Sequence, residues 1–360
     1  LLSGPCDEKH ATIELMENAR TILRAPMLAL VLIASCVAAP AWPQASMQAE
    51  VGSRPNAGGP ADVVHVRFGL IDIVEVDDRQ QRFTVDAFVE VRWRDRRLAF
   101  ESADAYEFRT VSAGEIWTPR LLIVNSRGLQ RLLPDVASVD PNGNVILRQR
   151  LVGPLATDLV LQDFPFDTQE LAIDVVSYQY SPQELVFSED SEIIANVTTF
   201  RSKGWFFEVL EPQFSEYRLA EDGTGTSLLR YLVRADRKSG FYVLTLALPM
   251  TLILFLAWMV HWLPPGIIPP RIGMSSATVF SLIALGVSFR LTLPAIDYLT
   301  RADRFVVFTT LLVAVSLAVT IITSTWASGD KLEEAERLSR RMRLVFPIAY
   351  AGIILASLAA

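Results

Sequence analysis

Residues 83–93 alternate between apolar and polar side chains, which is the pattern of a strand with one buried face and one wet face. Phe88 breaks this alternation, because it places an aromatic ring on the polar face. The turn Pro141-Asn142-Gly143-Asn144 predicts a hairpin, and residues 222–225 predict a second one further along the chain. Short strands separated by such turns predict a β-sandwich over residues 63–239.

Four long apolar runs follow the predicted sandwich. They predict membrane-spanning helices over residues 241–262, 271–293, 304–327 and 343–360, within a transmembrane domain at 240–360. No aspartate or glutamate occurs between Asp236 and Asp297, an absence that a chain wholly in water would not show. Basic residues gather in a charged connector at 330–343, so the positive-inside rule places this connector inside and the sandwich outside.

Residues 1–45 have the features of a presequence with a secretory signal. Arg20 and Arg24 precede an apolar stretch, and small residues around Ala39 would allow cleavage. A membrane anchor is the alternative, although the stretch is short for a span. Residues 46–62 are rich in Gly, Pro, Ala and Ser and predict a flexible lead-in to the sandwich.

Both cysteines, Cys6 and Cys36, lie in this predicted presequence. Residues 33–36 also resemble a lipoprotein processing box, which would place a lipid on Cys36. The remaining chain has no cysteine, which excludes a disulfide or a thiolate metal site there.

Charge and motif content narrow the functional classes. The formal net charge of -7 argues against a nucleic-acid partner, which usually requires a basic face. Only His65 and His261 follow the presequence, and no Gly-x-Ser-x-Gly or His-x-x-His spacing occurs. The sequence therefore predicts no enzyme, no cofactor and no metal site.

Several motifs together identify a family. The run Asp163-Phe164-Pro165-Phe166-Asp167 resembles the signature loop of the pentameric ligand-gated ion channels, the Cys-loop receptor superfamily. Thr157 and Leu171 stand where animal receptors have the loop cysteines, and bacterial members lack that disulfide. Further motifs in the expected order are Ile116-Trp117-Thr118-Pro119, Arg237-Lys238-Ser239-Gly240-Phe241-Tyr242, Pro249, Pro270-Arg271-Ile272-Gly273 and Leu293-Pro294.

The resemblance implies a homopentamer with a pore lined by the second span. Counting back from Pro294 in the family register, the residues expected to face the pore are Gly273, Ala277, Phe280, Ala284, Val287 and Leu291. Five copies of Phe280 would form a hydrophobic gate that closes by dewetting. Thr278, Ser281, Ser288 and Thr292 form a separate polar stripe, which either faces wet crevices behind the pore or indicates a rotated register.

The residues at the inner end of this helix predict whether the channel selects anions or cations. Cation channels of the family have an acidic ring there, whereas this chain has Pro270 next to Arg271, as in the anion-selective members. The charge of the predicted ectodomain argues against anion selectivity, because residues 46–239 contain 30 acidic and 21 basic residues. Because the Debye length is about 8 Å at physiological salt, charge at the constriction should outweigh diffuse charge further away. The sequence therefore favours anions over cations.

The resemblance also implies coupling and agonist sites. The coupling residues expected where the ectodomain meets the membrane are Asp77, Asp78, Pro165, Asp167, Arg237 and Pro294, with residues 295–300 as the receiving loop. The agonist pocket between subunits is expected near Phe88, Val124, Tyr178 and Tyr217, whose aromatic rings would hold an amine. Arg148 and Arg150 would favour an anionic ligand instead, and protons are a further possibility.

These expectations combine into one predicted protein. It is a multi-pass homopentameric channel of the bacterial inner membrane, with its N-terminal domain in the periplasm and membrane lipid around it. A small-molecule agonist or protons would open it to permeant inorganic ions. The alternative is a membrane-tethered periplasmic binding or sensor module that conducts nothing.

Overall fold

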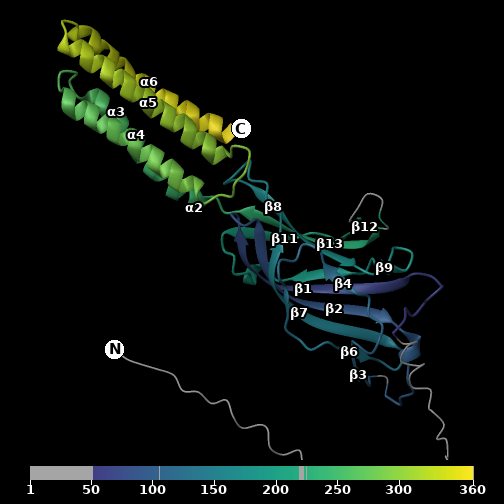
Figure 1. The fold of residues 1–360 in the computed structure, drawn as a ribbon. Coiled ribbons are helices and arrows are strands. Elements are labelled where there is room, and N and C mark those ends of the chain that lie inside the picture. Colours follow the sequence, from purple (N-terminus) through teal and green to yellow (C-terminus); the bar gives the residue numbers. More distant parts are fainter. Residues whose placement is uncertain (1–51, 105, 219–222, 224, 360) are drawn as a thin grey trace, which may run out of the picture. The chain divides into compact units, whose positions relative to one another are not determined.

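The computed structural model describes residues 52–104, 106–218, 223 and 225–359 (Figure 1). The predicted secretory signal, the candidate lipid site at Cys36 and the start of the lead-in lie outside the described residues, as do two of the four residues of the predicted turn at 222–225.

Two sheets form the N-terminal domain, and their strands pair antiparallel except where β1 pairs in parallel with β9 and β10. The larger sheet has the order β10-β1-β2-β7-β6-β3, with β5 paired to β7 and β9 to β1. The smaller sheet has the order β11-β13-β8-β4, with β12 paired to β13. The strands are β1 (Asp62–Asp77), β2 (Arg82–Arg94), β3 (Arg109–Ser112), β4 (Leu121–Ile123), β5 (Gln130–Arg131), β6 (Val136–Val139), β7 (Asn144–Ala156), β8 (Thr168–Ser177), β9 (Leu185–Phe187), β10 (Glu192–Ala195), β11 (Trp205–Val209), β12 (Gln213–Tyr217) and β13 (Thr226–Arg237).

The apolar face of each strand forms the core of this domain. In β2 the buried residues Phe83, Val85 and Ala87 alternate with partly exposed polar ones, as the sequence pattern predicts. Phe88 lies on the outer face and is 37% exposed. The sandwich thus buries one side of β2 and leaves Phe88 on the outer side, as the sequence predicts.

The first predicted hairpin joins β6 and β7. Val139 pairs with Val145 across it, and Gly143 has a φ of 78°, which a residue without a Cβ adopts at little cost. The Asp140 carboxylate accepts hydrogen bonds from the backbone N–H groups of Asn142 and Asn144. The second predicted hairpin is also confirmed by its strands, because β12 and β13 pair antiparallel.

The C-terminal domain is helical. Figure 1 shows its long helices running alongside one another. The chain first forms a nearly continuous helix, in which a π-turn at Val243–Ala247 precedes Pro249, a residue without a backbone N–H to donate. The segments are α2 (Gly240–Tyr242), α3 (Leu248–Met259), a 3-10 turn (Val260–Trp262), α4 (Ile268–Arg290), α5 (Arg301–Ser328) and α6 (Leu332–Ala359).

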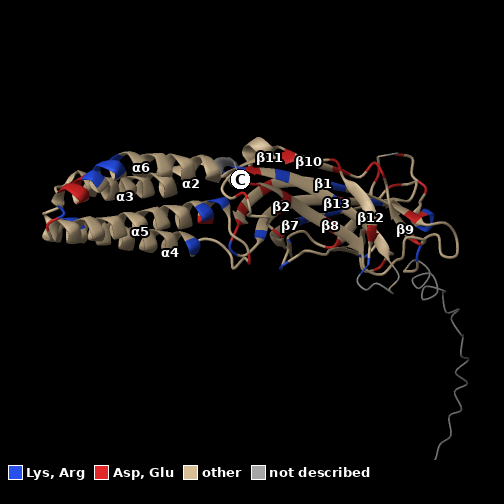
Figure 2. Ribbon diagram, turned by 90° about the horizontal axis from the view of Figure 1, so that it is seen from above, with Lys and Arg blue, Asp and Glu red and all other residues tan. Residues whose placement is uncertain are grey.

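Three helical stretches of the described chain are long and apolar enough to cross a membrane. They are Gly240–Trp262, Ile268–Arg290 and Arg301–Ser328, which match the first three predicted spans. Helix α6 is not among them over its described residues. In Figure 2 the charges of α4 and α5 lie at the helix ends, and those of α6 lie in its first half.

The prediction that residues 330–343 form a charged connector separate from the last helix is wrong. Helix α6 already begins at Leu332, so most of the connector is helical. Arg337 and Arg340 lie one turn after Glu333 and Glu336. The distances from guanidinium nitrogen to carboxylate oxygen are 3.9 Å for the first pair and 3.4 Å for the second. Such pairs stabilise exposed helical turns. This explains why the charged segment is helical and forms the first turns of α6, ahead of its apolar part.

Candidate functional sites

The six residues predicted to line a pore share one exposed face of α4. Phe280, Val287 and Leu291 are 71, 58 and 67% exposed in the single subunit, and Gly273, Ala277 and Ala284 are also exposed. On the opposite face Ser275, Thr278 and Leu282 are buried. An apolar face that no other described part of the subunit covers is what a helix around a shared axis requires.

The hydroxyl groups of α4 do not form one wet stripe. The Ser275 hydroxyl donates to Thr320 on α5 at 3.3 Å, and the Thr278 hydroxyl bonds back to the Ser275 carbonyl at 2.8 Å. Thr278 therefore packs inside the subunit, whereas Ser281, Ser288 and Thr292 are exposed. Crevices behind the pore are thus not needed to explain Thr278.

Arg271 does not lie on the exposed face at the inner end of α4. Its side chain is fully buried and donates one hydrogen bond, to the Ser339 hydroxyl of α6 at 3.3 Å. Its Nε and Nη1 have no hydrogen-bond partner in the described part of the chain. Arg271, predicted together with Pro270 for selectivity, therefore lies inside the subunit, while Pro270 beside it is exposed.

Arg237 is the centre of a buried cluster at the end of β13. Its guanidinium donates to both oxygens of Asp167, at 2.7 and 3.0 Å, and to both oxygens of Asp78, at 2.8 and 2.7 Å. The rings of Trp205 and Phe164 lie 4.0 and 4.7 Å from the guanidinium carbon. Burial alone would lower the pKa of Arg237, but the hydrogen bonds to Asp78 and Asp167 outweigh it and raise this pKa.

The two neighbouring acids predicted for coupling have different partners. Asp78 pairs with Arg237, as described above, whereas Asp77 lies 3.7 Å from Arg82 and accepts from the Gln80 backbone. The structure therefore brings Asp78, Asp167 and Arg237 together and leaves Asp77 outside the cluster. The two acids form a matched pair for mutagenesis.

The signature loop contacts the start of α5 directly. The Arg301 and Ala302 backbone N–H groups donate to the carbonyls of Gln162 and Phe164, at 3.0 and 3.2 Å. Arg301 also pairs with Asp163 at 2.9 Å. Sequence reasoning missed this part of the junction, although opposite charges at Asp163 and Arg301 were a signal.

Phe164 connects this loop to two helical segments. Its ring centroid lies 4.9 Å from that of Tyr242 in α2 and 6.0 Å from that of Phe289 near the end of α4. Pro165 and Pro294, both predicted for coupling, are buried. Phe164 therefore packs against both α2 and the C-terminal end of α4.

The four predicted agonist residues are not brought together within one subunit. Phe88 faces outward from the larger sheet, whereas Tyr217 lies on β12 and Val124 follows β4 in the smaller sheet. Tyr178 follows β8 and is 61% exposed. The arginines considered for an anionic ligand are already paired, Arg148 with Glu90 at 2.7 Å and Arg150 with Asp86 at 2.8 Å.

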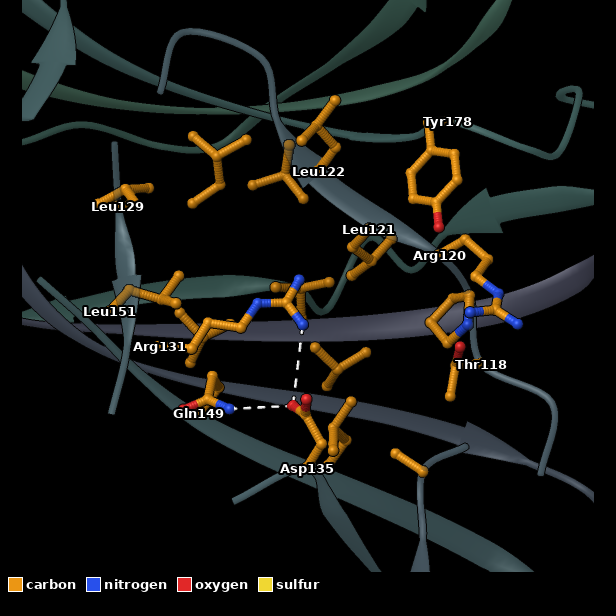
Figure 3. A pocket seen from close by; sticks show the side chains of 18 of the residues that line it. Thr118, Arg120, Leu121, Leu122, Leu129, Arg131, Asp135, Gln149, Leu151 and Tyr178 are labelled. Atoms are coloured by element: carbon orange, nitrogen blue, oxygen red, sulfur yellow. Dashed lines mark hydrogen bonds and ion pairs between the residues drawn. The ribbon is translucent and has the colours of Figure 1, made fainter. Parts of the chain in front are cut away.

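A cavity of about 400 Å³ lies between the two sheets (Figure 3). Most of its lining is apolar and comes from β1, β2, β4, β7 and β8. Tyr178 lines it, but Phe88, Val124 and Tyr217 do not. Among the described residues, no group of three or more His, Cys, Asp or Glu side chains could hold a metal ion.

Comparison with known proteins finds a family model and relatives that match this chain. A family model described as the neurotransmitter-gated ion-channel ligand binding domain matches residues 50–222. Over these residues the chain is similar to the ligand-binding domains of neurotransmitter-gated ion channels. The "Proton-gated ion channel" of Gloeobacter violaceus is 26% identical over 292 residues, which cover 80% of this chain and 81% of that protein. The predicted resemblance to prokaryotic ligand-gated channels is therefore confirmed, and the family is one of channels and not of enzymes.

The polar face of β2 makes a pH-dependent contribution to the stability of the sandwich through Glu90. Burial alone would raise the pKa of Glu90, but hydrogen bonds from Arg148 and Arg92 outweigh it and lower this pKa below the ordinary 4.5. The stabilisation is thus complete above pH 4.5 and is lost as the pH falls through the lowered value.

We expect the melting temperature of Glu90→Gln to lie below that of the wild type at neutral pH. The gap should shrink as the pH falls below about 4.5, because protonation removes the same interaction. Glu208→Gln, at an exposed pair with Arg234, is the control and should follow the wild type. Parallel curves for the wild type and Glu90→Gln would contradict this assignment.

Proposed function

We propose that the chain assembles as a homopentameric ligand-gated ion channel whose pore is lined by α4. The observation that carries this proposal is the uncovered apolar face of α4, formed by the six predicted pore residues. Cyclic symmetry would bring five such faces around one axis and shield them from lipid. The buried Arg237 cluster and the loop contacts to α5 supply the route from the outer domain to the pore.

The membrane arrangement follows from the helices and charges. We propose that α6 is the fourth span, with its basic first half on the inner side and the sandwich outside. Arg337, Arg340 and Arg341 would then lie at the inner lipid headgroups. The predicted secretory presequence and the similarity to a bacterial channel support the inner membrane as the location, with the sandwich in the periplasm.

We propose external acid as the opening stimulus. The support is the similarity to a channel that carries the description "Proton-gated". A small molecule held between subunits, near Phe88 of one and Tyr178 and Tyr217 of the next, is the alternative stimulus. Lowering the external pH in proteoliposomes distinguishes the two, because only acid gating gives a current without any added agonist.

We propose that the open pore prefers anions. No acid occurs in α4, and the helix begins at the inner side, where the N-terminal end of its dipole is positive. Arg271 adds a buried charge near this end, and no carboxylate pairs with it among the described residues. This charge acts through the field in the pore rather than by contact with the ion.

The reversal potential under a salt gradient tests this selectivity. We expect a value near the chloride equilibrium potential for the wild type and a shift toward the cation potential for Arg271→Gln. Lys331→Gln removes an exposed inner charge and should leave the potential unchanged. A wild-type value at the cation potential would contradict anion preference, and absence of current from assembled protein would favour the tethered binding module.

A further inference from the structure

The two lysines of the sandwich domain lie together at one end of it. Residues 46–239 contain 21 basic residues, of which only Lys203 and Lys238 are lysines. Lys203 lies two residues before β11, and the Lys238 backbone N–H donates to the Gly204 carbonyl at 2.9 Å. The two lysines therefore flank the start of β11, although they are far apart in the sequence.

This end of the sandwich lies where the chain enters the membrane. Trp205, the first residue of β11, pairs with Arg237, the last residue of β13. The first helical stretch that is apolar enough to cross a membrane begins at Gly240, two residues after Lys238. Each headgroup layer of a bilayer is about 5–7 Å thick, which two extended residues span. We therefore expect Lys238 and the start of β11 at the level of the lipid headgroups.

Two exposed aromatic rings lie beside Lys238. Phe206 in β11 is 64% exposed, and its ring centroid is 4.3 Å from the Lys238 ammonium nitrogen. Phe241, three residues after Lys238, is 69% exposed. Apolar rings gain free energy when they leave water, and the boundary between headgroups and acyl chains accommodates them. The exposure of both rings at this level therefore favours contact with lipid.

Neither lysine has a carboxylate partner among the residues that the structure describes. The ion pairs of these residues involve arginines only. Asp236, the acid nearest to Lys238 along the chain, accepts a hydrogen bond from the Thr168 hydroxyl at 2.6 Å. A lysine places its compact charge on a flexible stem, so its methylene groups can cover apolar surface while the ammonium reaches a phosphate. Two such charges beside exposed rings complement an anionic phospholipid.

We propose that the start of β11 is a docking site for an anionic phospholipid of the outer leaflet. The lipid phosphate binds Lys203 and Lys238, and the rings of Phe206 and Phe241 lie at the boundary between headgroups and acyl chains. A lipid occupant is favoured because the site continues the surface of the first membrane-spanning stretch. The choice of leaflet rests on the proposed orientation, whereas lipid binding does not depend on whether the assembled protein conducts.

A fluorophore at position 206 tests this site in the full chain reconstituted into liposomes. In a background with Cys6→Ser and Cys36→Ser, a bimane label is attached to Phe206→Cys or to Phe214→Cys. Phe214 is also an exposed phenylalanine of the smaller sheet, but it pairs with Leu229, about 26 Å along β13 from the membrane end. Brominated lipids quench only nearby fluorophores, so we expect quenching at position 206 and not at position 214.

Lipid charge is tested by placing the bromine on either phosphatidylglycerol or phosphatidylcholine in the same equimolar mixture. Brominated phosphatidylglycerol should quench the label at position 206 more strongly, because each lysine at an anionic surface contributes about fivefold to affinity. The double variant Lys203→Gln/Lys238→Gln should remove this preference. Arg218→Gln is the matched control, because it removes an exposed charge that pairs with Glu216 on β12, and it should retain the preference.

Three results would overturn the proposal. Equal quenching by the two brominated lipids would show that the site does not select an anionic headgroup. A preference that survives in the double lysine variant would show that other charges cause it. Absence of quenching at position 206 would show that a neighbouring subunit or water, and not lipid, covers this surface. Because Lys203 and Phe206 are exposed, their substitution leaves the core of the sandwich intact.

Discussion

Phe280→Ala is expected to produce a channel that conducts without any stimulus. Phe280 is the largest side chain on the exposed face of α4 and is 71% exposed in the single subunit. Five phenyl rings at one level of a pore would exclude water and therefore ions, and their removal lets the constriction fill with water. The resting current per assembled channel in planar bilayers should rise at least about tenfold.

The control for this experiment lies three residues further along the same helix. Ile283 is 47% exposed but is not among the predicted pore residues, so Ile283→Ala should leave the resting current unchanged. Equal currents from both variants would mean that general loosening of the helix bundle, and not a wider constriction, causes the leak. A silent, correctly assembled Phe280→Ala channel would contradict the role of Phe280 as the gate.

Asp78→Ala is expected to disconnect the outer domain from the pore while leaving the protein folded. Arg237 is buried between two carboxylates, and Asp167 still compensates its charge when Asp78 is removed. Asp167 is more deeply buried than Asp78 and also accepts a hydrogen bond from the Gln169 amide, so Asp167→Ala would disturb folding more than Asp78→Ala. For Asp78→Ala we expect at least about tenfold less acid-evoked current at the same surface amount of protein.

Asp77→Ala is the matched control for the junction. Asp77 is the preceding residue and carries the same charge, but its partners are Arg82 and the Gln80 backbone, not Arg237. Its removal should change the evoked current by less than about twofold. If Asp77→Ala and Asp78→Ala reduce the current equally, the loss comes from the charge of the turn, and the Arg237 cluster has no specific part in opening.

Part of this structure follows from local sequence patterns. The alternation in residues 83–93 predicts the buried face of β2 because successive side chains of a strand point to opposite sides. The Asn-Gly turn sets the pairing of β6 with β7 for an equally local reason. The exposed face of α4 follows from helical spacing once the family resemblance fixes its register.

Other features depend on distant segments and could not be predicted in this way. The burial of Arg271 depends on Ser339, which is 68 positions away on another helix. The different partners of Asp77 and Asp78 depend on which side of the turn faces Arg237. The cavity is formed by strands of both sheets, so no single run of sequence carries a sign of it.

Thiol accessibility along α4 tests most directly whether this helix lines an ion pore. Cys6→Ser and Cys36→Ser remove both natural cysteines, and Phe280→Ala supplies a current without a known agonist. In that background Ala284→Cys lies on the exposed face, and Leu282→Cys lies on the buried one. We predict that a charged methanethiosulfonate reagent applied from outside changes the current of Ala284→Cys and leaves that of Leu282→Cys unaltered. Modification of Leu282→Cys with no effect at Ala284→Cys would contradict the account, as would the absence of any current from assembled protein.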